Sequence, residues 1–456
     1  MDNSSFDQQW MHETTLHPIA LVILVVACIA TLFASRRAAV MAMLFVACFV
    51  SPGQNLVVFG ASLYLLRILT LIGIVRVLVR GEAASVRPNL IDAMMLLWFS
   101  ASILAYTAQQ QSFAGFKFVA GQGIDSAGAY FVFRCLFKGI DDLKAYIRWQ
   151  SILAIPVAIA FIYEYSTRYN VFSIFGGVPE VTEQRQGVLR CQGAFAHPIL
   201  AGTFWASVLP LLIGSWWVRA QNRVIGAVGL ICSMMIIVLC ASSTPLLGVI
   251  ACGFGLALFP FRSTIKAIRW ASLVLLIGLH FVMQSPLWSV LARIKIVAGS
   301  TGYYRYQLVD AAIAHVDDWW LCGMASNASW SVKLGHYLTD ITSQYILEAL
   351  RGGLLTLGLF VGMIWFCFKR VGFLTRTTRN RGDQILLWCL GVTLAVHAIC
   401  FIAVSYFGQI VMLFNLHLAL IAAMPLAPTR RKAIAERTHT EQLISVPYLM
   451  GETQYG

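Results

Sequence analysis

The sequence is poor in charged residues. Of its 456 residues only 12% are Asp, Glu, Lys or Arg, whereas 59% are hydrophobic, and the mean hydropathy is +0.75. Soluble domains carry charge on about a quarter of their residues. The scarcity of charge therefore excludes an ordinary soluble protein and predicts an integral membrane protein, with its backbone satisfied in helices rather than in a barrel.

Two other patterns are missing. The eleven cysteines show no CxxC spacing, so a zinc site is not supported, and most lie in apolar runs where they pack as small hydrophobic residues. The first seventeen residues contain no Lys or Arg, so we expect no cleavable signal peptide. Cys191 and Cys322 lie outside the apolar runs, and in an oxidising compartment they could form a disulfide.

Apolar runs long enough to cross a bilayer as helices recur along nearly the whole chain. They predict an all-α, polytopic membrane protein with about 12 to 13 transmembrane helices. The expected spans are residues 18–35, 38–50, 56–79, 90–107, 115–137, 144–163, 198–218, 224–241, 245–261, 270–285, 352–368, 384–404 and 408–427.

Lys and Arg gather in every second connection between these spans, within a net charge of +13. Because cytoplasmic connections collect basic residues, the alternation predicts an external N-terminus and a cytoplasmic C-terminus. The expected organisation is an external tail (1–17), membrane helices (18–285) with an external loop at 164–197, a large external loop carrying short helices (286–351), further membrane helices (352–427) and a cytoplasmic tail (428–456).

The two long external loops nevertheless contain basic residues, on the side that normally avoids them. These are Arg168, Arg185, Arg190, Arg293, Lys295, Arg305, Lys333 and Arg351. Ordinary solvated loops would explain them, and so would the binding of an anionic group at the outer face.

The larger external loop also contains a helical pattern. In "YRYQLVDAAIAH", Leu308, Ala311, Ala312 and His315 recur at helical spacing, so we expect a short amphipathic helix that lies on the membrane or caps a cavity. The "DDWW" that follows would place its two tryptophans in an interfacial aromatic belt.

Three stretches resemble a known family. "RQGVLRCQGAFAHPILAGTF", "RYQLVDAAIAHVDDWWLCGMAS" and "SQYILEALRGGLLTLGLFV" are similar, in order and spacing, to segments of the O-antigen ligase and O-antigen polymerase superfamily of polytopic bacterial proteins. The resemblance covers roughly residues 127–362. It implies a GT-C-like fold and a metal-independent glycosyltransferase without a cofactor in the bacterial inner membrane.

The resemblance implies a reaction as well. Such enzymes transfer a glycan from a polyprenyl-pyrophosphate donor to a saccharide or lipid-linked acceptor, alongside other polysaccharide-assembly proteins and without nucleic acid. A repeat-unit polymerase is the first expectation, and a ligase acting on lipid A core is the second. Basic residues at the outer face suit this reading, because guanidinium groups bind phosphate oxygens in pairs.

The motifs assign roles to individual residues. Arg190 matches the arginine before the "G-x-F-x-H-P" element and Arg305 matches the arginine that opens the loop helix, so both are expected to bind the donor phosphates. Arg185 and Tyr345 are further candidates for substrate binding. His197 either contacts substrate or caps the span that begins at Pro198.

The chain departs from the family pattern at two positions. Ligases have a histidine, proposed to activate the acceptor hydroxyl, before "N-x-Y-L", where this chain has Thr342 and Ser343; the family often has an arginine where this chain has Thr244. Replacement bases would be His336 first and Asp340 second, with Glu348 and His315 behind them, because a histidine suits proton removal at neutral pH. Positioning of the substrates could also replace base catalysis.

Charged residues inside the spans are expensive and usually face a cavity or one another. Asp125 and Arg134 lie nine residues apart, too far to pair along one helix face, so we expect partners on other helices or a place along the substrate path. Two other functional classes stay open. A flippase for the lipid-linked glycan would show repeats or paired broken helices, and no matching halves are found; a non-catalytic scaffold would tolerate loss of the arginines.

Overall fold

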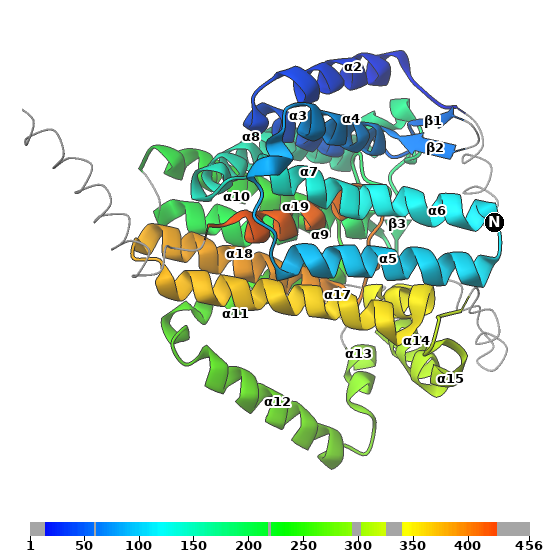
Figure 1. The fold of residues 1–456 in the computed structure, drawn as a ribbon, viewed down its shortest axis with the longest axis vertical. Coiled ribbons are helices and arrows are strands. Elements are labelled where there is room, and N and C mark those ends of the chain that lie inside the picture. Colours follow the sequence, from blue (N-terminus) through cyan, green and yellow to red (C-terminus); the bar gives the residue numbers. More distant parts are fainter. Residues whose placement is uncertain (1–13, 59–60, 218–219, 294–301, 325–339, 426–456) are drawn as a thin grey trace, which may run out of the picture.

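The computed structural model describes residues 14–58, 61–217, 220–293, 302–324 and 340–425. Long helices dominate this part of the chain (Figure 1). They are α2 (Pro18–Phe33), α3 (Arg36–Phe49), α4 (Leu65–Val79), α5 (Leu90–Gln110), α6 (Phe113–Gly123), α7 (Ala129–Leu136), α8 (Ile140–Thr167), α9 (Pro198–Gly214), α10 (Ala220–Leu239), α11 (Ser243–Ala257), α12 (Ile265–Val282), α17 (Gln344–Thr377), α18 (Arg381–Cys400) and α19 (Gln409–Ala423). Shorter helices are α13 (Val290–Arg293), α14 (Gly302–Ala314) and α15 (Val316–Trp319).

Each of the thirteen predicted ranges overlaps one of these helices, with α6 and α7 joined into one by a π-helical turn, Ile124–Gly128, although the bounds differ by several residues at α8, α12 and α17. Among the described residues, six helices are long and apolar enough to cross a membrane: Leu90–Gln110, Ile140–Thr167, Pro198–Trp217, Ile265–Val282, Gln344–Thr377 and Arg381–Cys400. The helices at residues 18–33, 223–239, 243–257 and 409–423 are apolar but shorter. The structure thus supports a helical membrane protein.

The prediction of one helix over residues 56–79 is wrong in its first part. Strands β1 (Asn55–Val58) and β2 (Ala61–Tyr64) pair antiparallel there, and α4 begins only at Leu65. Asn55 also exchanges two backbone hydrogen bonds with Thr15. An apolar run shows no period that separates strand from helix, which is why the hairpin was missed.

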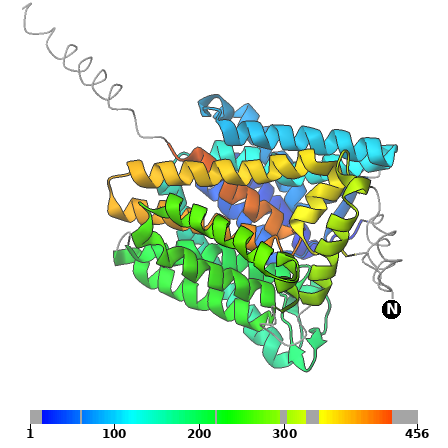
Figure 2. The same cartoon turned by 90° about the horizontal axis from the view of Figure 1, so that it is seen from below.

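The helices pack side by side around α19, which is buried along most of its length (Figures 1 and 2). Helices α7, α17 and α18 contact it, and α9, also largely buried, lies against α10, α11 and α18. Helix α12 differs from the others, since none of its residues is buried and Figure 1 shows it displaced from the bundle. Its apolar surface suits contact with lipid.

Connections predicted on the same side of the membrane meet at the same end of the bundle. Arg36 donates to the carbonyl of Leu136, Arg80 to that of Phe33, and Lys144 pairs with Asp383 at 2.8 Å. We call the end of the bundle that carries Arg36, Arg80 and Lys144 the basic end. At the other end, residues 50–54 lie against residues 175–177, as the hydrogen bonds of Ser51 and Gln54 show.

Charged residues within the helices find partners on other helices, as expected. Arg67 of α4 pairs with both carboxylate oxygens of Asp125, which lies in the π-helical turn, and Arg134 of α7 pairs with Asp92 of α5. Pairing lowers the cost of holding these charges between apolar helices.

The second long loop is shorter than predicted, because α17 begins eight residues before the expected start at residue 352. Gly352 and Gly353 break its helical backbone, with φ of +71° at Gly353, and α15 packs there: Leu354 donates its amide to the carbonyl of Trp320. A Cβ at Gly353 would lie 2.5 Å from the carbonyl oxygen of Leu321, so the close approach requires glycine.

The expected loop helix is present as α14, and Leu308, Ala311 and Ala312 are buried as the pattern predicts, although His315 falls just beyond its end. Trp319 is also buried, donating its indole N–H to the carbonyl of Ala312, so it belongs to this packing rather than to an aromatic belt.

Cys191 and Cys322 are both free thiols, so the disulfide considered for them is not formed. Cys191 is fully buried, and Cys322 is exposed.

Candidate functional site

The segment between α8 and α9 folds over the end of the bundle opposite the basic end, which we call the site end. Strands β3 (Gln184–Arg185) and β4 (Val188–Leu189) form a small hairpin in this segment. The buried carboxylate of Glu164, in the last turn of α8, accepts hydrogen bonds from the backbone amides of Gln192 and Gly193 and from the hydroxyl of Thr182. These bonds hold the segment in place just before the start of α9.

Arg190 is positioned by this fold and is only 4% exposed. Its backbone amide donates to the carbonyl of Glu183, and its guanidinium pairs with the Glu183 carboxylate at 3.1 Å. Burial lowers the pKa of Arg190, Glu183 opposes that shift and Arg185 adds to it. The positive charge of Arg190 is therefore partly balanced by a half-exposed carboxylate.

Arg305 reaches the same end from α14 and is 8% exposed. Its Nε donates to the carbonyl of Ala403, 3.1 Å away, and its Nη2 to the hydroxyl of Thr244, 3.2 Å away. Within the described residues no carboxylate forms an ion pair with Arg305. Burying a cation with neutral acceptors alone is costly, so an anion from outside the chain would stabilise it.

Arg185 links the two buried arginines. Burial and then the charge of Arg185 lower the pKa of Arg305, and the same side chain acts on Arg190. Arg185 is thus within electrostatic reach of both buried arginines, and Glu183 is the one carboxylate among the described residues that acts on either of them, which leaves an excess of about two positive charges. We call Arg185, Arg190 and Arg305 the arginine cluster.

His197 has the capping role that was one of its two expected roles. Its Nδ1 accepts the backbone amide of Ile199 at 3.1 Å, and Pro198 occupies the first position of α9. Burial and then the charge of Arg190 lower the pKa of His197 to about 4. The imidazole is therefore neutral at pH 7 and carries its proton on Nε2, which makes it a hydrogen-bond donor beside the arginine cluster.

The remaining predicted residues are not gathered with these. The Tyr345 hydroxyl donates to the carbonyl of Ala398 at 2.8 Å, and this hydrogen bond joins α17 to α18. Asp340 is exposed, and its backbone carbonyl accepts the Tyr304 hydroxyl at 2.6 Å, so it lies beside the helix of Arg305. His336 lies outside the described residues. Catalytic or substrate contact by these three stays a prediction.

Sequence reasoning missed two partners in the site. Thr244 was noticed only as a departure from the family pattern, yet its hydroxyl is the one that receives Arg305. Glu183 was not singled out, although it lies seven residues before Arg190. The hairpin of β3 and β4 separates the two in sequence and joins them in space, so spacing alone gave no signal.

The N-termini of α9, α11 and α17 lie at this end and add to the positive potential. Helix α9 begins after His197, α11 begins at Ser243 beside Thr244, and α17 begins after Ser343, whose hydroxyl donates to the carbonyl of Phe401. Helix N-termini carry a partial positive charge and orient free N–H groups. Together with the arginine cluster they favour an anion at this end.

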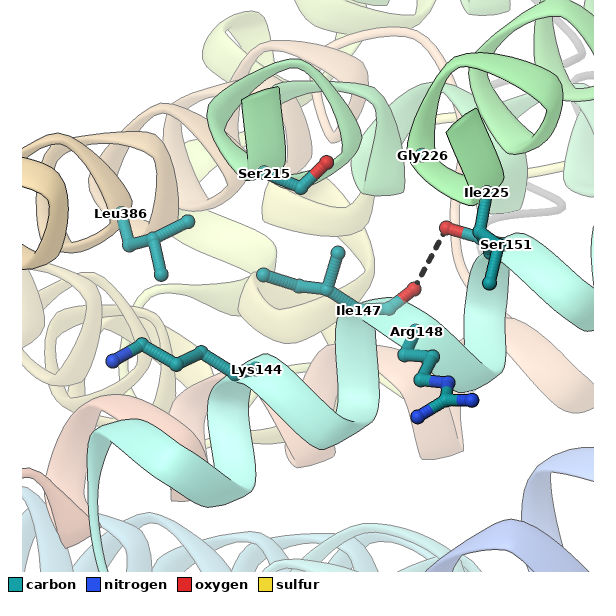
Figure 3. Close-up of a pocket in the computed structure, with 8 residues that line it drawn as sticks. All are labelled: Lys144, Ile147, Arg148, Ser151, Ser215, Ile225, Gly226 and Leu386. Carbon is teal, nitrogen blue, oxygen red and sulfur yellow. Dashed lines mark hydrogen bonds between the residues drawn. The ribbon is translucent and has the colours of Figure 1, made fainter. Parts of the chain in front are cut away.

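A small pocket lies at the basic end instead (Figure 3). Lys144 and Arg148 of α8 line it with Ser215, which follows the C-terminus of α9, about 27 Å along that helix from His197 at 1.5 Å per residue. The Lys144 ammonium is already paired with Asp383. This pocket is therefore separate from the arginine cluster.

Comparison with protein-family models, with curated proteins and with solved structures finds no match to this chain. The chemistry of the site is thus read from its own residues. Buried guanidinium groups with a neutral histidine donor can hold a pyrophosphate and stabilise negative charge that develops on it as a leaving group.

Proposed function

We propose that this protein is a bacterial inner-membrane glycosyltransferase of surface or exopolysaccharide assembly. It transfers a glycan from a polyprenyl-pyrophosphate donor to a saccharide acceptor at the outer face of the membrane, and it acts as a repeat-unit polymerase. The observation that carries the proposal is the arginine cluster, with its excess positive charge at the end of a lipid-facing bundle. The resemblance of residues 127–362 to O-antigen ligases and polymerases supports the same reaction.

The arginines have a definite role in this reaction. As the acceptor oxygen attacks the anomeric carbon, the bond to the phosphate oxygen breaks and its electron pair leaves with the pyrophosphate. Arg305, whose hydrogen-bond partners among the described residues are neutral, and Arg190 would stabilise that charge. The Nε2–H of His197 would donate to the same group.

The test is deletion of the gene in its host, followed by size separation of lipid-linked and surface glycans. If the protein is a polymerase, the deletion strain should accumulate single repeats on the carrier and should lack the ladder of longer glycan chains. Full-length chains stranded on the carrier would show a ligase acting on lipid A core, and glycans held at the cytoplasmic face would show a flippase. An unchanged glycan profile would contradict all three.

Complementation tests the site itself. Arg305→Ala, at a protein level equal to that of the unaltered chain, should fail to restore the ladder. Arg148→Ala should restore it, because this exposed arginine lies at the basic end. A ladder restored by both variants would remove the arginine cluster from the reaction and favour a scaffold.

A further inference from the structure

A continuous hydrogen-bonded chain of four side chains, none of them in the arginine cluster, lies inside the bundle. The Tyr406 hydroxyl bonds to Nδ1 of His397 at 2.8 Å, Nε2 of His397 to Nδ1 of His417 at 2.9 Å, and Nε2 of His417 to the Tyr146 hydroxyl at 2.7 Å. Gln150 donates to the same Tyr146 oxygen at 3.3 Å. The two histidines are fully buried and Tyr146 is 1% exposed.

The bonding pattern allows two proton arrangements of equal charge. In one, Tyr406 donates to His397, His397 to His417, and His417 to Tyr146. In the other every bond is reversed, because each imidazole carries one proton that can sit on either nitrogen. If a proton enters at the Tyr406 oxygen, each bridging proton moves across its own hydrogen bond and the Tyr146 hydroxyl gives up its own proton, the first arrangement becomes the second, which is how a proton relay operates.

The surroundings contain no fixed charge that would lock one arrangement. His397 is packed by the rings of Phe401, Phe414 and Tyr406. The other titratable side chains that act on the two tyrosines are Cys48 at Tyr146, and Cys400 and Tyr345 at Tyr406. Within the described residues, no carboxylate, lysine or arginine makes a hydrogen bond or ion pair with a member of the chain.

One end of the chain lies in the segment that holds Arg305. Tyr406 belongs to the segment between α18 and α19, whose Ala403 carbonyl accepts Arg305 at 3.1 Å. The backbone amide of Tyr406 donates to the side chain of Gln344, at the start of α17. The other end, at Tyr146, lies two turns into α8 from the basic end. The chain therefore leads inward from the segment that holds Arg305.

We propose that Tyr406, His397, His417 and Tyr146 form a proton relay that accepts the proton of the acceptor hydroxyl. This proposal rests on the proposed transferase function, and it supplies the base that is missing at Thr342. The acceptor oxygen forms its bond to the anomeric carbon and gives its proton to the Tyr406 oxygen, while the Tyr406 proton moves to Nδ1 of His397. Because no carboxylate among the described residues pairs with the two buried imidazoles, they hold the added proton only during the transfer, and it returns through Tyr406 to water or to the released pyrophosphate.

The test compares Tyr406→Phe, which removes only the hydroxyl that opens the relay, with Thr393→Val. Thr393 lies one turn before His397 on α18, is buried and has no hydrogen-bond partner for its hydroxyl, so its replacement controls for disturbance of the core. With purified protein and a polyprenyl-pyrophosphate-linked oligosaccharide, Tyr406→Phe should lower kcat by roughly 10²-fold and change the solvent isotope effect, with KM for the donor unchanged. Equal kcat and isotope effect in the two variants would overturn the relay and favour Asp340 or His336 as the base.

If the unaltered protein transferred no glycan, the proposed function would be wrong. A second measurement tests the relay even in that case. Nitrogen-15 NMR of labelled histidines should show Nε2 of His397 and Nδ1 of His417 sharing one proton, and Tyr406→Phe should shift the signals of both rings. Fixed tautomers, with a change confined to His397, would refute the relay whatever the protein transfers.

Discussion

At the scale of single residues, the site depends on how Arg305 is held. Its guanidinium donates one N–H to a backbone carbonyl and one to a threonine hydroxyl, and the described residues leave three of its five donors for a ligand. Both acceptors are neutral, so they orient the guanidinium of Arg305 without forming an ion pair with it. Such an arrangement suits a phosphate that arrives and leaves with each turnover.

Thr244→Val tests this orientation. Valine keeps the shape of threonine but cannot accept from Nη2, and a hydrogen bond to a charged group contributes about 1.5–3 kcal/mol. We expect KM for the donor to rise roughly tenfold or more, with a smaller effect on kcat. Thr203→Val is the control, because the Thr203 hydroxyl bonds only to the carbonyl of Ile199 within α9. Similar KM values in the two variants would show that Thr244 does not orient Arg305.

His197 makes stability depend on pH. Its pKa is about 4 in the folded protein and 6.5 without the fold's influence, so between these values the unfolded chain binds a proton that the folded chain does not. The contribution of His197 is therefore unchanged above pH 6.5, and stability falls as pH decreases from 6.5 to 4. His197→Asn keeps an oxygen that can cap α9 but does not titrate. In detergent, its melting temperature should fall less between pH 7.5 and pH 5 than that of the unaltered protein, and an equal fall would contradict the shift.

At this scale the sequence predicted part of the site. Arg190 and Arg305 were chosen for their motifs and for an excess of basic residues on one side, and the structure brings both to one end with Arg185. Thr244 and Glu183 could not be predicted, because their roles depend on how α11 and a two-residue hairpin are placed. The histidines of the relay lie in separate apolar helices, and nothing in the spacing of residues 397 and 417 indicates that the rings touch.

At the scale of elements, the end of α8 organises the site. Glu164 is 1% exposed and accepts from two backbone amides and one hydroxyl of the following segment, so the helix end and the segment with Arg190 are one unit. Gly193 lets the segment pass close to α8: its φ is +58°, and a Cβ there would lie 2.4 Å from the ring of Phe161. The position of Arg190 follows from this attachment.

Glu164→Gln should loosen that attachment. A carboxamide replaces one accepting oxygen with an NH₂ group facing N–H donors, and an unsatisfied buried polar group costs about 1–3 kcal/mol. We expect a lower melting temperature and faster proteolysis within residues 168–197. Glu180→Gln is the matched control, since the structure uses the backbone carbonyl of Glu180 and its side chain is exposed. Equal proteolysis of the two variants would rule out the role of Glu164.

The elements themselves were predictable where one physical property decides them. A long apolar run must form a helix to satisfy its backbone in lipid, and all thirteen ranges contain helix. The hairpin at residues 55–64 and the early start of α17 depend on tertiary contacts: Asn55 pairs with Thr15, and Gln344 donates its amide to the carbonyl of Phe401. Hydropathy carries no information about such contacts.

At the scale of the whole molecule, the two ends of the bundle differ in how charge is held. At the basic end, cations pair with carboxylates and with helix C-terminal carbonyls, as Arg37 does with Asp142 and Arg80 with the Phe33 carbonyl. At the site end, the three arginines of the arginine cluster have a single carboxylate partner among the described residues, Glu183. A bundle in a membrane with its basic end in the cytoplasm would therefore present an anion-binding end to the outer face.

Cys322 offers a direct test of this orientation. It is the exposed one among the eleven cysteines, it is free, and its carbonyl accepts the side chain of Gln109 near the kink of α17, which places it at the site end. In intact cells whose outer membrane has been made permeable, a membrane-impermeant maleimide should label the unaltered protein and not Cys322→Ser. Labelling that appears only after the inner membrane is opened would place the arginine cluster in the cytoplasm. The donor would then have to be bound before it crosses the membrane, which is the behaviour of a flippase rather than of a polymerase or a ligase.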